Sequence, residues 1–222
     1  MSNDSESRWR VSAASAADAP DTPDIPPPTP LNPWLTMWWA PRRTVRSLMA
    51  SEERPSWIPV VALAGINSSL LWLLNGSGEA LREPASALGF ALFQGGLQLV
   101  YGVLISPFII GLIGGWLGAD GDAVDIRLAI AWAYLPVAAA VILWLPLFAL
   151  FGWSALHMNT ETPTPAQALA LLLYLPLGLA PTYGFALQVG GVAAALQTSL
   201  WRALAILLIP AVPAILLMGA FR

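Results

Sequence analysis

The charged residues of this chain stand in short groups that leave five long stretches without any charge. The uncharged runs cover residues 55–78, 84–119, 128–160, 162–201 and 203–221. A helix at the surface of a water-soluble core keeps a polar stripe at the helical repeat, whereas these runs are apolar on all sides. An apolar stretch of about 20 residues is long enough to cross a bilayer as a helix. The pattern therefore predicts an all-α integral membrane protein.

Composition supports this class. Hydrophobic residues make up 57% of the chain and charged residues only 10%, against about 25% charged in a typical soluble domain. All basic residues are arginine, the net charge is −3, and no basic face for nucleic acid is evident. The chain has no cysteine, which excludes disulfides and thiolate metal sites.

We expect a bundle of five transmembrane helices within a domain at 55–222. The predicted spans lie at 57–76, 86–118, 128–152, 166–196 and 203–221. The fourth run contains Pro176 and Pro181, so it could be one kinked span or a broken pair of shorter segments. Two full spans need roughly 40 apolar residues and a polar turn, which this run lacks. One kinked span is the favoured interpretation.

The residues before the first span predict how the protein is oriented. Residues 1–31 are rich in Ser, Ala, Asp and Pro, which favours a disordered tail. Arginines collect in cytoplasmic flanks, and six of them precede the first span: Arg8, Arg10, Arg42, Arg43, Arg46 and Arg54. We therefore expect a multi-pass protein of the cell (cytoplasmic) membrane with its N-terminus in the cytoplasm.

Residues 32–54 begin with "NPWLTMWWAPRRTVR" and combine tryptophans with arginines. Tryptophan rings prefer the headgroup level of a membrane. In a helix, Val45 and Leu48 would share a face opposite the arginines, as in an amphipathic segment on the cytoplasmic leaflet. An aromatic belt of the first span is disfavoured because Trp34 lies 23 positions before Trp57. The predicted interfacial anchor consists of Trp34, Trp38, Arg42, Arg43 and Arg46.

The loop "ADGDAVDIR" (119–127) holds three carboxylates and invites comparison with a calcium-binding loop. An EF-hand loop needs glycine at its sixth position and glutamate at its twelfth. Counted from Asp120, these positions are Asp125 and Ala131. We predict instead that Asp122 or Asp125 caps the helix that follows.

Ser154 and the single histidine, His157, lie in one short loop, and the next acid is Glu161. Nucleophilic catalysis needs an aligned base, an orienting group and oxyanion donors, none of which this loop supplies by its pattern. The sequence predicts no catalytic, cofactor-binding or metal-binding residue.

The predicted spans contain no Asp, Glu, Arg, Lys or His but do contain neutral polar groups. Gln94, Gln98 and Tyr101 fall on one helical face, which must turn toward protein partners or trapped water. Hydrogen bonding between helices is the favoured role, and a polar solute path is the alternative. Small residues that allow close helix packing are Gly111, Gly114, Gly115 and Gly118.

Three segments resemble the prokaryotic branch of the Yip-one domain family, whose name derives from Ypt/Rab-interacting protein. They are "NPWLTMWWAPRRTVRSL", "LIGGWLGADG" and "IRLAIAWAYLPVAAAVILWLP", and the likeness extends over residues 32–222. The resemblance implies a cytoplasmic N-terminus and five spans. Eukaryotic members are implicated in Rab GTPase binding and carry a "DLYGP"-like segment and a Gly-Tyr pair. Here Asn32-Pro33-Trp34 and Ala133-Tyr134 stand in those places, so the resemblance implies architecture rather than Rab binding.

From these observations we expect a non-enzymatic multi-pass protein that organises membrane or partner proteins. The expected partners are the lipid bilayer and a membrane protein or a second copy of the chain, with no nucleic acid. The alternative is a small-solute transporter or channel subunit that uses the face of Gln94, Gln98 and Tyr101. An intramembrane hydrolase is a distant third.

Overall fold

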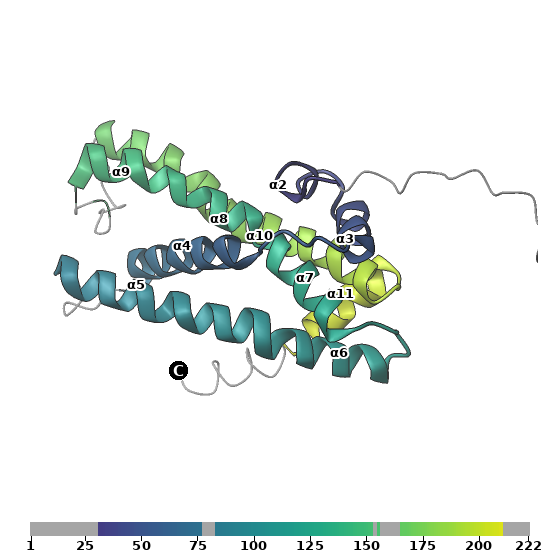
Figure 1. The fold of residues 1–222 in the computed structure, drawn as a ribbon. Helices are drawn as coiled ribbons and strands as arrows, with labels where there is room; N and C mark the ends of the chain where they lie inside the picture. Colours follow the sequence, from purple (N-terminus) through teal and green to yellow (C-terminus); the bar gives the residue numbers. More distant parts are fainter. Residues whose placement is uncertain (1–30, 77–82, 153–154, 156–164, 211–222) are drawn as a thin grey trace, which may run out of the picture. The chain divides into compact units, whose positions relative to one another are not determined.

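A computed structural model describes residues 31–76, 83–152, 155 and 165–210, and within these ranges every regular element is a helix (Figure 1). The predicted tail lies outside the described residues except for Leu31. In chain order the elements are α2 (Pro33–Thr36), α3 (Pro41–Ala50), α4 (Ile58–Gly76), α5 (Pro84–Leu99), η2 (Val100–Ile105), α6 (Ser106–Trp116), α7 (Ala123–Ala133), α8 (Leu135–Ala140), η3 (Val141–Leu143), α9 (Trp144–Phe151), α10 (Pro165–Ala195) and α11 (Leu200–Leu208).

Three helices are long and apolar enough to cross a membrane: Ala85–Trp116, Ala123–Phe151 and Ala170–Ala195. The first predicted span forms a shorter apolar helix, Ile58–Leu74. The last predicted span begins in α11 and continues into residues 211–222, which lie outside the described residues. The all-helical architecture and its compatibility with a membrane are thus confirmed, while the count of five spans stays a prediction.

Helices α7 and α10 pack on each other and contact most of the other elements. Residues 128–133 of α7 are all buried. This helix contacts α3, α4, α6, η2 and α10, and α10 in turn contacts α3, α8 and α11. Alanine is frequent on both helices, and α10 also carries four glycines; such small side chains let apolar helices approach closely.

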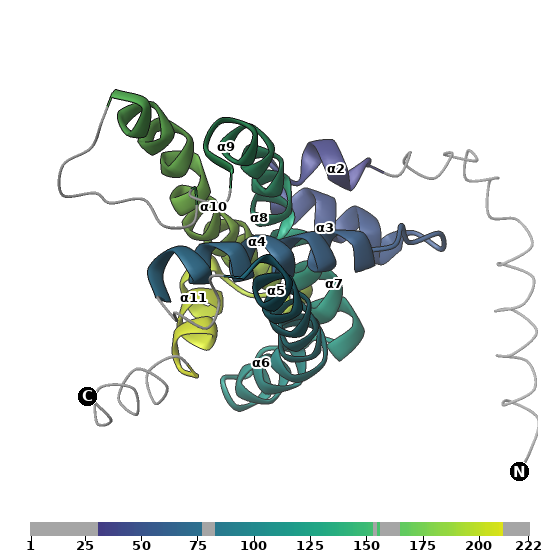
Figure 2. The ribbon, with the colours of Figure 1, turned by 90° about the vertical axis from the view of Figure 1, so that its left-hand side faces the viewer.

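A glycine contact allows α4 and α5 to cross closely, as the view along α5 in Figure 2 shows. A Cβ atom added to Gly65 would lie 2.7 Å from the Cα atom of Gly95. Beside this contact, the Ser69 hydroxyl donates to the carbonyl of Gly65 at 2.8 Å and to that of Ala91, on α5, at 3.1 Å. Helices α4 and α5 therefore cross where both carry a glycine, so no side chain separates the two backbones.

Proline interrupts the hydrogen-bond pattern of the second apolar run at Pro107. A proline has no N–H to donate to the carbonyl four residues before it, which here belongs to Val103. The backbone just before Pro107 widens into the π-helix η2, a form that often marks a functional or strained position. The Nε atom of Arg127, on α7, donates to the Val103 carbonyl at 3.0 Å. A side chain from the neighbouring helix therefore satisfies the acceptor that the proline leaves free.

The third apolar run is divided into shorter helices. Helix α7 ends at Ala133 and α8 begins at Leu135 with Pro136 in its first turn, because Pro136 has no N–H to donate to the carbonyl of Trp132. The run begins at Ala123, several residues before the predicted start at 128, since Asp122 caps the helix there. The run packs against α4 and α10 on both sides of this division.

The fourth apolar run is one helix. Helix α10 continues from Pro165 to Ala195 through both Pro176 and Pro181. This segment therefore forms one helix and not a broken pair of shorter segments. Its length exceeds the ~20 residues that a span needs, so one end is free to carry residues at the membrane surface.

Candidate functional site

The predicted interfacial segment folds into two short helices, each started by local sequence. The Asn32 side chain caps α2 by accepting from the N–H of Trp34 at 3.1 Å. Pro41 starts α3, where its missing N–H leaves no partner unsatisfied. The hydroxyl of Thr44 lies 2.9 Å from that of Thr36 and joins the two helices. This hydrogen bond holds α2 and α3 as one unit.

Helix α3 packs its apolar face on α10 and α7. Val45 and Leu48 are buried, on the side opposite Arg43 and Arg46, which are exposed. Two glycines of α10 make room: a Cβ atom on Gly190 would lie 3.0 Å from Pro41, and one on Gly191 would lie 3.4 Å from Val45. The apolar face of this amphipathic helix therefore contacts the protein's own helices.

The tryptophans of this segment differ in their surroundings. Trp34 meets the buried Trp132 edge to face, with ring centroids 5.3 Å apart. Trp38 stacks on Tyr183 of α10 at 6.1 Å, and the Tyr183 hydroxyl donates to the Trp38 carbonyl. Trp39, which the sequence analysis did not single out, is 86% exposed. Trp34 and Trp38 thus dock the segment, while Trp39 faces outward.

The arginines of α3 gather on two sides. Arg42 and Arg46 line a cavity of about 300 Å³ at the C-terminal end of α10, together with Met49, Ala194, Gln197 and Thr198. Arg43 is exposed and lies outside that cavity. An Nη atom of Arg42 donates to the Thr198 carbonyl at 3.3 Å. Its Nε atom is buried and has no hydrogen-bond partner among the described residues.

The three arginines have no carboxylate partner in the part of the chain that the structure describes. The single ion pair there joins Arg54 to Asp125 at 3.5 Å. An Arg–carboxylate pair would cancel charge locally, whereas unpaired arginines attract anions. The cavity beside Arg42 and Arg46 is therefore electropositive.

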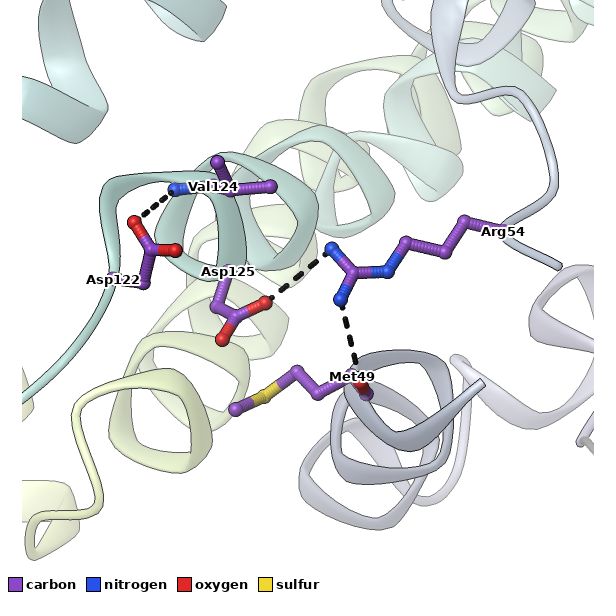
Figure 3. Close-up of polar contacts among 5 residues, drawn as sticks. All are labelled: Met49, Arg54, Asp122, Val124 and Asp125. Atoms are coloured by element: carbon purple, nitrogen blue, oxygen red, sulfur yellow. Dashed lines mark hydrogen bonds and ion pairs between the residues drawn. The ribbon is translucent and has the colours of Figure 1, made fainter. Parts of the chain in front are cut away.

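Arg54 links the end of α3 to the start of α7 (Figure 3). One Nη atom donates to the Met49 carbonyl at 3.3 Å, and the other pairs with Asp125. The Asp122 carboxylate accepts from the N–H of Val124 at 3.2 Å (Figure 3). The capping role predicted for this loop is thus confirmed for Asp122. Among the residues described, no group of three His, Cys, Asp or Glu side chains could hold a metal ion.

The three residues of the predicted polar face have different surroundings. Gln98 lines an interior cavity of about 240 Å³. Tyr101 lies in the π-helix η2 and is 56% exposed, and Gln94 lies outside this cavity. Gln98 forms a side-chain hydrogen bond with Tyr134, and Tyr101 lies close enough to interact with the same Tyr134 side chain.

Other polar side chains meet Gln98 at this cavity. They are Ser68 of α4, Tyr134 between α7 and α8, and Gln188 of α10. In the sequence Tyr134 and Gln188 are isolated polar groups within apolar runs, and Ser68 stands in the triplet Asn67-Ser68-Ser69. That signal marks a buried position but does not say which groups converge.

The four glycines predicted for helix packing have different surroundings: Gly111, Gly114, Gly115 and Gly118. A Cβ atom on Gly111 would lie 3.3 Å from Ile126, and one on Gly114 would lie 3.2 Å from Leu196. A Cβ atom on Gly115 would meet nothing within 4 Å. Gly118 has a φ of 67° beyond the end of α6, where a left-handed residue ends the helix. Ser154 and His157 lie outside the described residues.

Comparison of the chain with family models, curated proteins and solved structures finds no match.

Proposed function

We propose that this chain is a non-enzymatic multi-pass membrane protein that organises the membrane or partner proteins through α2 and α3. The observation that carries the proposal is a basic helix held on an apolar helical body with arginines on its outer side. Val45 and Leu48 fix α3 in place, and Arg43 is exposed on the opposite side of the helix. A docked helix presents its charges at a defined position, which a flexible basic tail cannot do.

Physical chemistry favours the cytoplasmic leaflet as the surface that α2 and α3 meet. Anionic lipids attract juxtamembrane arginines by about 1 kcal/mol each, and an exposed tryptophan such as Trp39 suits the headgroup level. The resemblance to the Yip-one domain family points to the same class of membrane-organising protein, with a cytoplasmic N-terminus and five spans.

A photoreactive residue tests this proposal in intact membranes. Placed at position 39, it should crosslink reproducibly to a membrane protein or to lipid. Met37, two positions away, is fully buried, so the same residue placed there should crosslink only within the chain. If position 39 gives no product outside the chain while the protein is folded, α2 and α3 are not a contact surface and the proposal fails.

A small-solute transporter or channel subunit is the second candidate, favoured by the cavity at Gln98. Four neutral polar side chains line it, and buried polar groups inside a membrane helix bundle need partners. A small uncharged polar solute matches these hydrogen-bonding groups better than an ion does, because no Asp, Glu, His, Lys or Arg lines the cavity.

Flux into vesicles containing the purified full-length chain tests this second candidate. Gln98→Leu and Gln188→Leu should each abolish uptake of small neutral polar solutes such as glycerol. Gln94→Leu is the matched control, since Gln94 lies on the same helix but outside the cavity. Uptake equal to that of protein-free vesicles would remove transport of such solutes as the function.

A further inference from the structure

One face of α10 joins two features that the proposed function does not use. Residues Leu179, Tyr183, Ala186, Gly190 and Ala194 recur at three- and four-residue spacing and therefore share a helical face. An apolar groove lies along the earlier part of this face, and the electropositive cavity lies at its end. The first turn of α3 covers Gly190 between them.

The groove is large, open to one side and almost entirely apolar. It has a volume of about 790 Å³ and is lined by side chains from α8, η3, α10 and the α2–α3 connection, among them Pro136, Ile142, Leu179, Tyr183, Ala186 and Trp38. The Tyr183 hydroxyl is already engaged by the Trp38 carbonyl. The groove therefore presents an apolar surface to any molecule that occupies it.

The cavity at the end of this face has the opposite character. Arg42 and Arg46 line it, and no described carboxylate neutralises them. The guanidinium groups that line the cavity can donate to a phosphate oxygen in the forked geometry that arginine favours.

We propose that this face binds one anionic phospholipid, with its phosphate between Arg42 and Arg46 and an acyl chain in the groove. Ala186 and Ala194 lie eight residues apart, which is about 12 Å along a helix, a distance that one phospholipid can bridge. The glycerol region then runs beside Pro41. A free phosphate would leave the groove empty, and an uncharged lipid would leave the arginines unpaired. Only a molecule with both parts uses both features.

This inference rests on the proposed function in one respect, which is that α3 lies at an anionic membrane surface. It goes further by naming a bound lipid rather than a general attraction. The bound lipid would also help to hold α3 on α10, because it contacts both helices.

Native mass spectrometry of the purified full-length chain tests the proposal. Phosphatidylglycerol, diacylglycerol and inorganic phosphate are the probes. Phosphatidylglycerol should remain bound, diacylglycerol should bind weakly, and millimolar phosphate should not displace the phospholipid. Replacing both arginines (Arg42→Gln with Arg46→Gln) should weaken phosphatidylglycerol binding about tenfold or more, since each cation contributes about 1 kcal/mol.

Matched variants separate the binding site from general effects. Arg43→Gln removes a neighbouring charge outside the cavity and should change affinity by less than about twofold. Ala186→Phe fills the groove and should weaken binding, whereas Ala205→Phe, at an exposed position of α11, should not. Arg46→Gln alone keeps the Arg42–Thr198 hydrogen bond and provides a folded variant, checked by its melting temperature, if the double substitution unfolds the chain.

Defined results overturn the proposal. Wild-type affinity in folded Arg46→Gln and in the double variant would show that the arginines do not bind the lipid. Displacement by inorganic phosphate would indicate a simple anion site. Crosslinks from position 186 to another part of the chain or to a second copy, instead of to lipid, would show that protein fills the groove. If position 39 still crosslinks to a membrane protein in any of these cases, the lipid site fails and the proposed function stands.

Discussion

At the scale of single residues, Arg127 restores a hydrogen bond that a proline removes. Its Nε atom donates to the Val103 carbonyl, the group that would accept from residue 107 in a regular helix. Unpaired carbonyls are costly in apolar surroundings, so this contact explains how a half-buried arginine is retained beside an apolar run. The same hydrogen bond joins α7 to the π-helix η2. It therefore links the third apolar run to the second, which precedes it in the sequence.

Arg127→Met should destabilise the full-length chain in mild detergent by about 1–3 kcal/mol, because the Val103 carbonyl loses its donor. The effect should shrink in a Pro107→Ala background, where residue 107 regains an N–H for that carbonyl. Thermal unfolding of the two single variants and the double variant measures the coupling. Additive losses would contradict this account of Arg127.

At the scale of elements, two contacts decide how helices lie against each other. Gly65 and Gly95 set the crossing of α4 and α5, and Val45 with Leu48 seats α3 on α10 and α7. Both contacts depend on close backbone approach or complete burial. Adding or removing one or two carbon atoms at either contact should therefore change the stability of the protein directly.

Gly65→Ala should lower stability by about 1–3 kcal/mol, since its Cβ atom would meet the Gly95 backbone at 2.7 Å. Gly96→Ala is the control, because a Cβ atom there would meet nothing within 4 Å and alanine favours helix over glycine by up to about 1 kcal/mol. Melting temperatures of the two purified variants should therefore move in opposite directions. A tolerated alanine at position 65 would refute the close crossing.

Leu48→Ala should loosen α3 from α10, with a local cost of about 2–5 kcal/mol from lost burial and a cavity. Amide hydrogen exchange across α3 should accelerate as a result. Leu35→Ala removes the same side chain from a position that is 68% exposed and should leave exchange in α3 unchanged. Equal exchange in both variants would mean that α3 is not held by this packing.

At the scale of the whole molecule, the number of spans determines which side each end of the chain occupies. Five spans and a cytoplasmic N-terminus place residue 222 on the opposite side of the membrane. A reporter that is active only outside the cytoplasm should be active when fused after Arg222 and inactive when fused after Ser12. An inactive C-terminal fusion of a stably expressed protein would require an even number of spans.

Local chemistry makes several features predictable from sequence alone. Long uncharged runs dictate helices, because in lipid every backbone group must find its partner within the segment. The cap at Asp122 depends on one side chain and the next turn of backbone, so a short motif is enough to identify it. The alternation of arginines and apolar residues in α3 likewise indicated which face is buried.

The tertiary structure decided what these groups meet. Apolar helices carry little information on their partners, since many rotations bury similar surface, so it was not evident that Gly65 and Gly95 would make the close contact between α4 and α5. Arg42 reaches Thr198, far along the chain, only because α3 folds back on the end of α10. The sequence determined that this protein is helical, with helices apolar and long enough to cross a membrane, because those properties are local. Contacts between distant segments decide which arginines share a cavity and which polar groups converge beside Gln98. These contacts could be known only from the fold itself.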